Sequence, residues 1–352
     1  MTASSRWELR PAAALETFAA HWDAFNARAG DLPFLRSQFL APLLGEFGSG
    51  AEQLAVCGGL EDPLAMAIVS RRGFGRWETF QPSQLPLGAW LKRPDAEFEL
   101  LVEGLSRRLP GFVLAVGLTQ LDPLVAPRPG DSGQVRTLDY VQTAWIDVRG
   151  TFEEYWAGRG KNLRQNMRKQ RTKLEADSIA TVLETLRSPD DVPQAIADYG
   201  MLESAGWKAS GGTAIHPSNA QGRFYRAMLQ SFFKSGAGRV YRYRLGEKVV
   251  AMDLCVEASG MLVILKTAYD ESLKAFSPAS LMHEQAFAAI FREGGIKRIE
   301  FYGALMEWHT RWTENARRLY HVNYYRWPIL SAAKDQIERL RARQRPSVPS
   351  PS

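Results

Sequence analysis

The sequence predicts an α/β (α+β) protein built from two similar halves. Strand-like apolar runs alternate with helix-like amphipathic segments along most of the chain. Both halves share one order of elements: a strand, two helices, an antiparallel hairpin, a helix and a strand. A length of 352 residues also exceeds what one average domain needs. Together these observations favour two domains related by duplication.

The first half contains a clear hairpin signal. Two short apolar runs, 52–57 and 64–70, are joined by Gly58, Gly59, Asp62 and Pro63, which are residue types that favour turns. Around this hairpin we expect strands at 7–10 and 112–116, and helices at 15–28, 35–47 and 95–109.

The second half repeats this order. Its hairpin strands, 239–244 and 249–257, flank the turn 245–248, and a further strand follows Ser259 and Gly260. The other expected elements are strands at 179–185, 261–268 and 298–302, and helices at 192–204, 221–235 and 279–293.

A strongly basic segment, 155–175, separates the halves. Lys161, Arg164, Arg168 and Arg171 are spaced by three or four residues, so they share one face of a helix. This face can bind phosphates, or it can be the solvated side of a connecting helix. The apolar face of the same segment consists of Leu163, Met167 and Leu174.

These segments predict the domain boundaries. We expect an N-terminal domain at 1–144, a basic connecting helix at 145–178, and a C-terminal catalytic domain at 179–330. The remainder, 331–352, reads as a charged helix and a disordered tail, because its proline and serine residues cannot pack a core.

Composition narrows the class of protein. The net charge of +6 and a pI near 9.3 favour an anionic partner, which can be nucleic acid, a phosphate-rich cofactor or an acidic membrane face. Nucleic acid explains the charge poorly, because no recognition motif accompanies it. We expect a cytoplasmic protein, since no long apolar run or signal core is found. Cys57 and Cys255 lie in apolar runs away from any ligand spacing, which predicts buried reduced thiols and no metal.

Two motifs in the second half can bind a ligand. The first, GWKASGGTAI at 206–215, places a glycine-rich stretch after a tryptophan and a lysine, although an ordinary surface loop would look the same. The second, KTAYDESLKAFSPASLM, runs from a strand through a small-residue turn at Ser277 and Pro278 into a helix. The N–H groups of such a helix start favour a phosphate, although a capped helix alone would also read this way.

The order of these segments resembles a known family. The basic helix, GWKASGGTAI, the hairpin, KTAYDESLKAFSPASLM and IEFYGALMEWHTRW together resemble CelD/BcsL-type acetyltransferases, over about residues 145–327. These belong to the FemAB-like branch of the GCN5-related N-acetyltransferase (GNAT) superfamily. The resemblance implies tandem GNAT-like domains, each with a mixed, mostly antiparallel central sheet flanked by helices. Two departures are Ala279, where relatives usually have glycine, and Trp308-His309, where they tend to have lysine.

The resemblance also implies ligands and site residues. The donor would be acyl-CoA or CoA, with acyl-ACP as a possible donor, and no metal. The cofactor-binding residues implied by the motif are Phe276, Ser277, Ala279, Ser280 and Leu281. The substrate-binding residues implied are Trp207, Lys208, Asp270 and Glu307.

No single residue stands out as the general base. The candidates are Asp253, Glu257, His283, Glu284, Glu307 and His309, since a carboxylate or an imidazole can accept a proton from an amine. Asp253 alternates with its apolar neighbours and is expected to point into the cleft. By analogy with FemX-like enzymes, Lys266 can offset an oxyanion, unless it forms a salt bridge with Asp270. We therefore expect Lys266, Asp253, His309 and Tyr269 to be catalytic.

The function predicted is N-acyl transfer by direct attack of an amine on an acyl thioester. The acceptor expected is an envelope-related amine, either a lipid or sphingoid amine or an amino sugar. The basic helix and exposed-looking aromatics, namely Trp308, Trp312, Tyr324 and Tyr325, would suit peripheral contact with the inner face of the membrane. Core packing explains most of those aromatics equally well. One alternative is a FemX-like transferase that uses aminoacyl-tRNA, in which case nucleic acid would be a partner. Another is a catalytically degenerate GNAT protein that assists polysaccharide synthesis.

Overall fold

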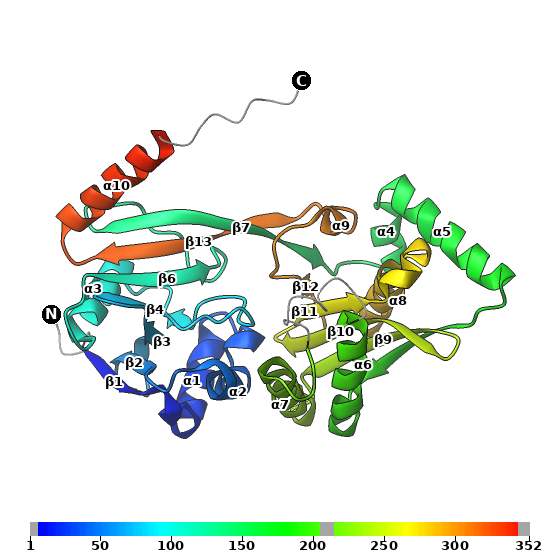
Figure 1. Cartoon of the computed structure of the whole chain (residues 1–352), viewed down its shortest axis with the longest axis horizontal. Helices are drawn as coiled ribbons and strands as arrows, with labels where there is room; N and C mark the ends of the chain where they lie inside the picture. Colours follow the sequence, from blue (N-terminus) through cyan, green and yellow to red (C-terminus); the bar gives the residue numbers. More distant parts are fainter. Residues whose placement is uncertain (1–5, 205–214, 344–352) are drawn as a thin grey trace. The chain divides into compact units, whose positions relative to one another are not determined.

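The computed structural model describes residues 6–204 and 215–343 (Figure 1). The chain forms two compact units that are not contiguous in sequence. The first unit comprises Met1–Gly30, Ser49–Tyr140 and Arg318–Ser352, and the second comprises Asp31–Gly48 and Val141–Arg317. The domains predicted from sequence are each continuous in the chain. The compact units are not, because Asp31–Gly48 belongs to the second unit and Arg318–Ser352 to the first.

The first unit is built on an antiparallel meander followed by a crossover. β1, β2, β3 and β4 pair antiparallel in sequence order, and β6 then pairs parallel with β4 after the helix α3. The short strand β5 lies beside β3, and β13 pairs with the other edge of β6. The elements are β1 (Trp7–Pro11), α1 (Ala19–Arg28), β2 (Gln53–Gly58), β3 (Pro63–Arg71), β4 (Arg76–Thr79), β5 (Trp90–Lys92), α3 (Phe98–Arg108), β6 (Ala115–Leu121), and α10 (Pro328–Arg343) after β13.

The second unit repeats this topology. β8, β9, β10 and β11 pair antiparallel in sequence order, and β12 pairs parallel with β11 after the helix α8. The elements are α2 (Ser37–Phe47), α4 (Phe152–Ala157), α5 (Lys161–Ala176), β8 (Thr181–Leu186), α6 (Val192–Ser204), α7 (Ala220–Lys234), β9 (Gly238–Leu245), β10 (Lys248–Ala258), β11 (Met261–Tyr269), α8 (Pro278–Glu293), β12 (Arg298–Glu300) and α9 (Glu307–Thr310).

The predicted fold class is confirmed by this repetition. Each unit is a mixed, mostly antiparallel sheet with helices. In each, a helix connects two strands that pair parallel: α3 connects β4 with β6, and α8 connects β11 with β12. Two strands that the sequence did not predict, β7 (Val135–Asp147) and β13 (Ala316–Tyr325), extend these sheets. In the second unit β12 pairs antiparallel with the end of β7, and in the first unit β6 pairs antiparallel with β13.

Each unit has its own hydrophobic core. In the second unit α2 packs on α7 through an edge-to-face contact between Phe39 and Phe224, whose ring centroids are 5.3 Å apart. Cys57 lies in the first core and Cys255 in the second, both as buried free thiols, as predicted. Burial raises the pKa of the Cys57 thiol to about 11, which keeps it protonated and unreactive at neutral pH.

Of the two interpretations of four aromatic residues near the end of the chain, exposure is wrong for three of them and core packing is confirmed for those three. Trp312, Tyr324 and Tyr325 are buried, and Trp308 is half-buried. Tyr324 and Tyr325 lie in β13, which the sequence did not reveal as a strand, so their role in packing was hidden. Trp312, Tyr324 and Tyr325 are therefore not a surface for lipid.

The basic helix has the two faces that the sequence predicts. Leu163, Met167 and Leu174 of α5 are buried, whereas Lys161 and Arg164 are exposed. The region 145–178, predicted as a connecting helix, contains the end of β7 and two helices, since α4 ends at Ala157 and α5 begins at Lys161. None of the helices in the described part of the chain has both the length and the apolar character needed to cross a bilayer.

Candidate active site

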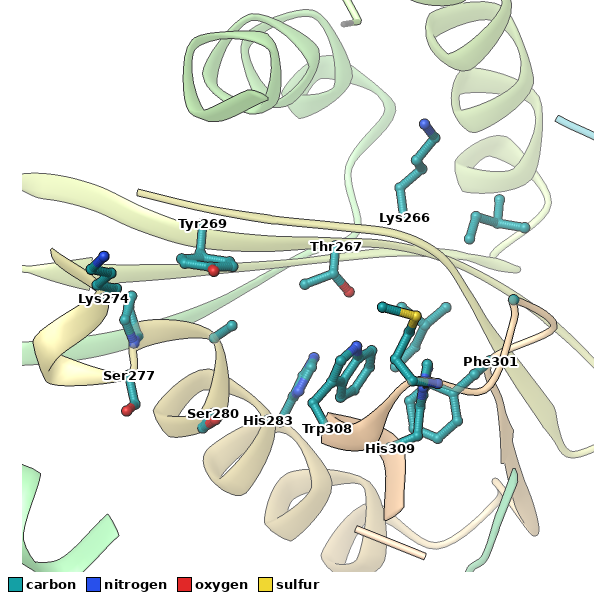
Figure 2. Close-up of a pocket in the computed structure, with 16 residues that line it drawn as sticks. Lys266, Thr267, Tyr269, Lys274, Ser277, Ser280, His283, Phe301, Trp308 and His309 are labelled. Carbon is teal, nitrogen blue, oxygen red and sulfur yellow. The ribbon is translucent and has the colours of Figure 1, made fainter. Parts of the chain in front are cut away.

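A cavity forms in the second unit where β11 and β12 separate. The two strands pair over only three residue positions, from Met261 with Arg298 to Val263 with Glu300. β11 then continues to Tyr269 while the chain after β12 turns away at Tyr302, whose φ is +45°. The resulting cavity has a volume of about 510 Å³ (Figure 2). Its lining consists of Ile264, Leu265, Lys266, Thr267, Tyr269, Lys274, Ser277, Pro278, Ala279, Ser280, His283, Phe301, Gly303, Met306, Trp308 and His309.

The N-terminus of α8 opens onto this cavity. Ser277 precedes the helix in a left-handed conformation, with φ 52°, and Pro278 is the first helical residue. The N–H of Leu281 donates to the Ser277 carbonyl, so the N–H groups of Ala279 and Ser280 come before the first intrahelical bond. These N–H groups, the helix dipole and the cavity-lining Lys274 suit a phosphate.

The alanine that replaces the usual glycine fits this geometry. Ala279 lies inside the helix, where alanine is the most favourable residue, and the left-handed position belongs to Ser277. Replacing glycine at 279 therefore costs no backbone strain. Of the other predicted cofactor residues, Ser277 and Ser280 line the cavity, Phe276 lies just before them, and Leu281 points into the core.

The basic helix α5 lies beside this helix start. The Asn166 amide donates to the Ser277 hydroxyl at 3.4 Å, and Lys173 Nζ lies 4.3 Å from the centre of the Phe276 ring. One turn further along, Arg171 of α5 pairs with Glu284 of α8. The packing of α5 along α8 thus adds positive charge near the N-terminus of α8, as expected for a site that binds an anion.

A buried carboxylate supports a histidine in the wall of the cavity. Asp253 on β10 is fully buried, and its Oδ1 accepts a hydrogen bond from the Thr267 hydroxyl at 2.5 Å. Its Oδ2 lies 3.0 Å from Nε2 of His283, although the angle is not that of a hydrogen bond. The His283 ring lies in the cavity wall beside Trp308 (Figure 2) and is close to parallel with it. The ring is also parallel to that of Phe287. The arrangement places an imidazole backed by a carboxylate at the cavity surface.

A second histidine, His309, is held in its neutral form. Burial lowers the pKa of His309 to about 4, and the nearby His283 contributes in the same direction. Its Nδ1 accepts a hydrogen bond from the Met306 N–H at 2.8 Å, which leaves the ring proton on Nε2. The ring stacks on Trp308 at 3.7 Å between centroids. His309 is therefore a hydrogen-bond donor, rather than a cation, in the wall of the cavity.

Comparison with known proteins identifies the fold of this region. Residues 161–310 match the family model for the acetyltransferase (GNAT) domain, so the match spans α5, the cavity and His309. Residues 161–310 therefore form an acetyltransferase (GNAT) domain. A search of curated protein sequences finds no significant match.

Solved structures resemble most of this chain at low sequence identity. The C-terminal domain of a protein assigned as a lysylphosphatidylglycerol synthetase from Agrobacterium fabrum is 11% identical, with a TM-score of 0.58 over 92% of this chain and 96% of that one. L-PGS from Bacillus licheniformis is 13% identical, with a TM-score of 0.52 over 92% and 97%. FemX is 9% identical, with a TM-score of 0.50 over 80% and 90%. At these identities the likeness shows a shared fold.

Lys266 of the GNAT domain lies on the other side of β11 from Thr267. The two side chains project to opposite sides of the strand, as alternation requires (Figure 2). Lys266 Nζ is 3.7 Å from Glu203 Oε1 and 5.8 Å from the centre of the Tyr225 ring. The alternative salt bridge between Lys266 and Asp270 is wrong, because Asp270 pairs with Lys248 instead.

The remaining predicted site residues are not all brought together. Tyr269 lines the cavity, whereas Asp270 is buried, paired with Lys248 at 2.5 Å and bonded to Ser272 at the start of a 3-10 helix. This pairing lowers the pKa of the Asp270 carboxyl. Glu307 is exposed and paired with Arg311. Trp207 and Lys208 lie outside the described residues.

Thr267, Lys274 and His283 are cavity-lining residues of the GNAT domain that the sequence did not single out as site residues. His283 was one of six candidate bases, and Thr267 was not considered. The feature that would have pointed to Thr267 is its position directly opposite Asp253 in the β10–β11 pairing. The hairpin turn alone does not fix that register, because β10 and β11 contain a bulge between Leu254 and Cys255.

The equivalent helix start in the first unit differs from that of the GNAT domain. Lys92 is buried before α3, and its Nζ donates to the carbonyl groups of Arg93, Pro94 and Ala96. Glu97 precedes the helix and Glu99 lies in its first turn. Because carboxylates at a helix N-terminus repel a phosphate, this position does not suit a pyrophosphate.

Proposed function

We propose that the second unit transfers an acyl group from acyl-CoA to an amine by direct attack, with His283 as the general base. The observation that carries the proposal is the pairing of cavity-lining His283 with the fully buried carboxylate of Asp253. A carboxylate beside an imidazole orients the ring and stabilises the imidazolium that forms when the ring accepts a proton. Asp253 is thus proposed as a positioning residue.

The donor would be bound at the N-terminus of α8. Its phosphates would accept hydrogen bonds from the N–H groups of Ala279 and Ser280, with Lys274 and Lys173 supplying charge. The acyl thioester would then extend along the unpaired edge of β11 between Ile264 and Tyr269. An acyl-ACP donor carries one phosphate beside its thioester and would use the same helix start.

The chemistry needs one base and one hydrogen-bond donor. The amine nitrogen attacks the thioester carbonyl, its proton passes to His283, and a new C–N bond replaces the C–S bond as the thiolate leaves. The neutral His309 can donate its Nε2 proton towards the negative charge that develops on the carbonyl oxygen. The thiolate then takes a proton, which balances the reaction. Tyr269 would act from the cavity side of β11, and Lys266 from the side where it is paired with Glu203.

The acceptor class proposed is an envelope-related amine, either a lipid or sphingoid amine or an amino sugar. A lipid amine is supported by the apolar and aromatic lining around Phe301, Met306 and Trp308. One fold neighbour is assigned by name to lysylphosphatidylglycerol synthesis, which points in the same direction. A cytoplasmic protein that acts at the inner face of the membrane would meet such acceptors.

The experiment is a titration of the purified full chain with CoA, acetyl-CoA and a long-chain acyl-CoA, followed by thermal unfolding and by release of free thiol with amine acceptors. A ligand at a hundred times its Kd adds about 2.7 kcal/mol to the free energy of unfolding. We expect stabilisation by the thioesters, and turnover that is lost in His283→Gln while CoA still stabilises the variant. Stabilisation without turnover on any amine tested would favour the accessory-protein alternative.

A transferase that uses aminoacyl-tRNA remains the second candidate, because α5 presents Lys161, Arg164, Arg168 and Lys169 as exposed cations. This candidate is distinguished from the acyl-CoA-dependent enzyme by transfer of an aminoacyl group from aminoacyl-tRNA, with no stabilisation of the protein by any CoA thioester. Loss of that transfer in an Arg164→Glu, Arg168→Glu variant would support it further.

A further inference from the structure

Four large apolar side chains are exposed at one end of the sheet in the first unit. Phe74 is 79% exposed, Phe112 59%, Trp327 41% and Ile329 74%. They come from the β3–β4 turn, the segment before β6, and the chain that follows β13 into α10 (Figure 1). We name these four residues the apolar tip.

Backbone hydrogen bonds hold the parts of the apolar tip together. The Gly75 carbonyl accepts from the N–H of Leu114, and the Leu114 carbonyl accepts from the N–H of Arg326. Three chain segments therefore lie side by side at this edge. The rings of Phe112 and Trp327 are 5.7 Å apart, so two of the four side chains are in direct contact.

The turn that carries Phe74 is shaped to project it. Gly73 and Gly75 have φ values of +131° and +67°, which residues with side chains rarely adopt. The Arg72 N–H donates to the Arg76 carbonyl and closes the turn. A closed turn that exposes a phenylalanine at its tip has no role in the core of the unit.

The surroundings of the apolar tip are positively charged. The β3–β4 turn and the strand ends beside it contribute Arg71, Arg72 and Arg76, and Glu78 of β4 is the acidic partner of both Arg72 and Arg76. Arg326 adds a further cation, with its guanidinium 5.5 Å from the centre of the Trp327 ring. Together Arg71, Arg72, Arg76 and Arg326 with Glu78 carry a formal net charge of +3 (four positive, one negative).

We propose that the apolar tip and its arginines are a docking surface for a membrane that contains anionic lipids. Aromatic side chains favour the boundary between headgroups and acyl chains, and arginines favour a negative leaflet, so both features fit one occupant. Charge complementarity selects the anionic membrane over a neutral apolar partner. The surface differs from the four aromatic residues predicted from sequence, of which three are buried. It deepens the proposed function by placing the enzyme where lipid acceptors are found, yet it does not depend on catalysis.

Vesicle co-sedimentation of the full chain, without donor or acceptor, tests the proposal. The vesicles are phosphatidylcholine alone and an equal mixture of phosphatidylcholine and phosphatidylglycerol. We expect binding to the mixed vesicles, weaker binding to phosphatidylcholine, and weakening as salt is raised. The double variant Phe74→Ser, Phe112→Ser should lower the partition coefficient at least about tenfold, because each ring loses its burial in the interface. Arg71→Glu should lower it only for the anionic vesicles.

The matched control is Met201→Ser on α6, which removes a side chain that is also exposed, at 63%, from the other unit. It should bind vesicles like the wild type. Equal binding by the double variant and the control would overturn the proposal, as would failure of the wild type to bind mixed vesicles. A wild-type dimer that becomes a monomer in the double variant would instead assign the apolar tip to self-association. Because the assay contains no substrates, a negative result leaves acyl transfer untouched.

Discussion

Nε2 of His283 lies 3.0 Å from Oδ2 of Asp253, and the two residues reach each other from α8 and β10 across the core of the second unit. The carboxylate is fully buried, and its other oxygen is bonded to Thr267. A buried carboxylate is costly to keep without partners, so the pair is a specific arrangement rather than a surface contact.

The first prediction concerns catalysis by this pair. His283→Gln should lower kcat by about 10²–10⁴ because the base is lost. Asp253→Asn should lower kcat by a smaller factor, with little change in KM for the thioester. The check is the pH profile of kcat, in which the limb that requires a deprotonated base should flatten in His283→Gln. His216→Gln, an exposed histidine in a turn of the same unit, is the control and should behave like the wild type.

The second prediction concerns the stability of the protein at acidic pH. The pKa of His309 is lowered to about 4 in the folded state, from 6.5 in the unfolded chain. The unfolded state therefore binds more protons between these values, and stability falls as pH drops from 6.5 through 4. His309→Asn keeps an acceptor for the Met306 N–H and removes the titration. The measurement is the free energy of unfolding from urea melts at several pH values. Between pH 6.5 and pH 4 the variant should lose less stability than the wild type, by up to about 3 kcal/mol.

The third prediction concerns the donor site. Lys274→Glu should raise KM for acyl-CoA by about tenfold, because the charge at the helix start is reversed, and the effect should shrink as salt is raised. Kinetics at low and high salt give the measurement, with Lys234→Glu at the end of α7 as a control for the change in net charge. An unchanged KM would place the phosphates of the donor elsewhere.

The sequence was sufficient for the order of elements in both halves, because each has strong apolar periodicity and turn residues. The segment 192–204, for example, was predicted as a helix and is α6 with the same ends. It was not sufficient for β7 and β13, in which charged and aromatic residues interrupt the apolar alternation. Both strands depend on pairing with distant partners, β12 and β6, and local patterns carry no information about those partners.

In the candidate site, too, local features could be predicted from the sequence and contacts between distant residues could not. The turn at Ser277 and the start of α8 are local features, and the sequence placed them correctly. The contact between Asp253 and His283 depends on strand register and on the rotation of α8, neither of which is local. For the same reason, the sequence suggests an ion pair between Lys266 and nearby Asp270, whereas in the structure Lys266 pairs with Glu203 on α6.

The last prediction concerns a buried ion pair that holds the second unit together. Arg317 Nη1 is 2.9 Å from Glu300 Oε2, and both side chains are buried. The guanidinium also lies 5.1 Å from the centre of the Trp145 ring and 5.0 Å from that of Tyr302. The Arg317→Met variant takes a buried cation away from a fully buried carboxylate and should lose about 3–5 kcal/mol of stability.

The matched control is the neighbouring residue in the chain. Arg318 pairs with Asp139, but both side chains are about half exposed, so Arg318→Met should cost at most about 1 kcal/mol. Urea unfolding of both variants gives the comparison. Restoring neutrality in Arg317→Met, Glu300→Gln should recover part of the loss, because the uncompensated charge is removed. If the single and double variants were equally unstable, packing of the guanidinium between the two rings, rather than charge, would account for the effect.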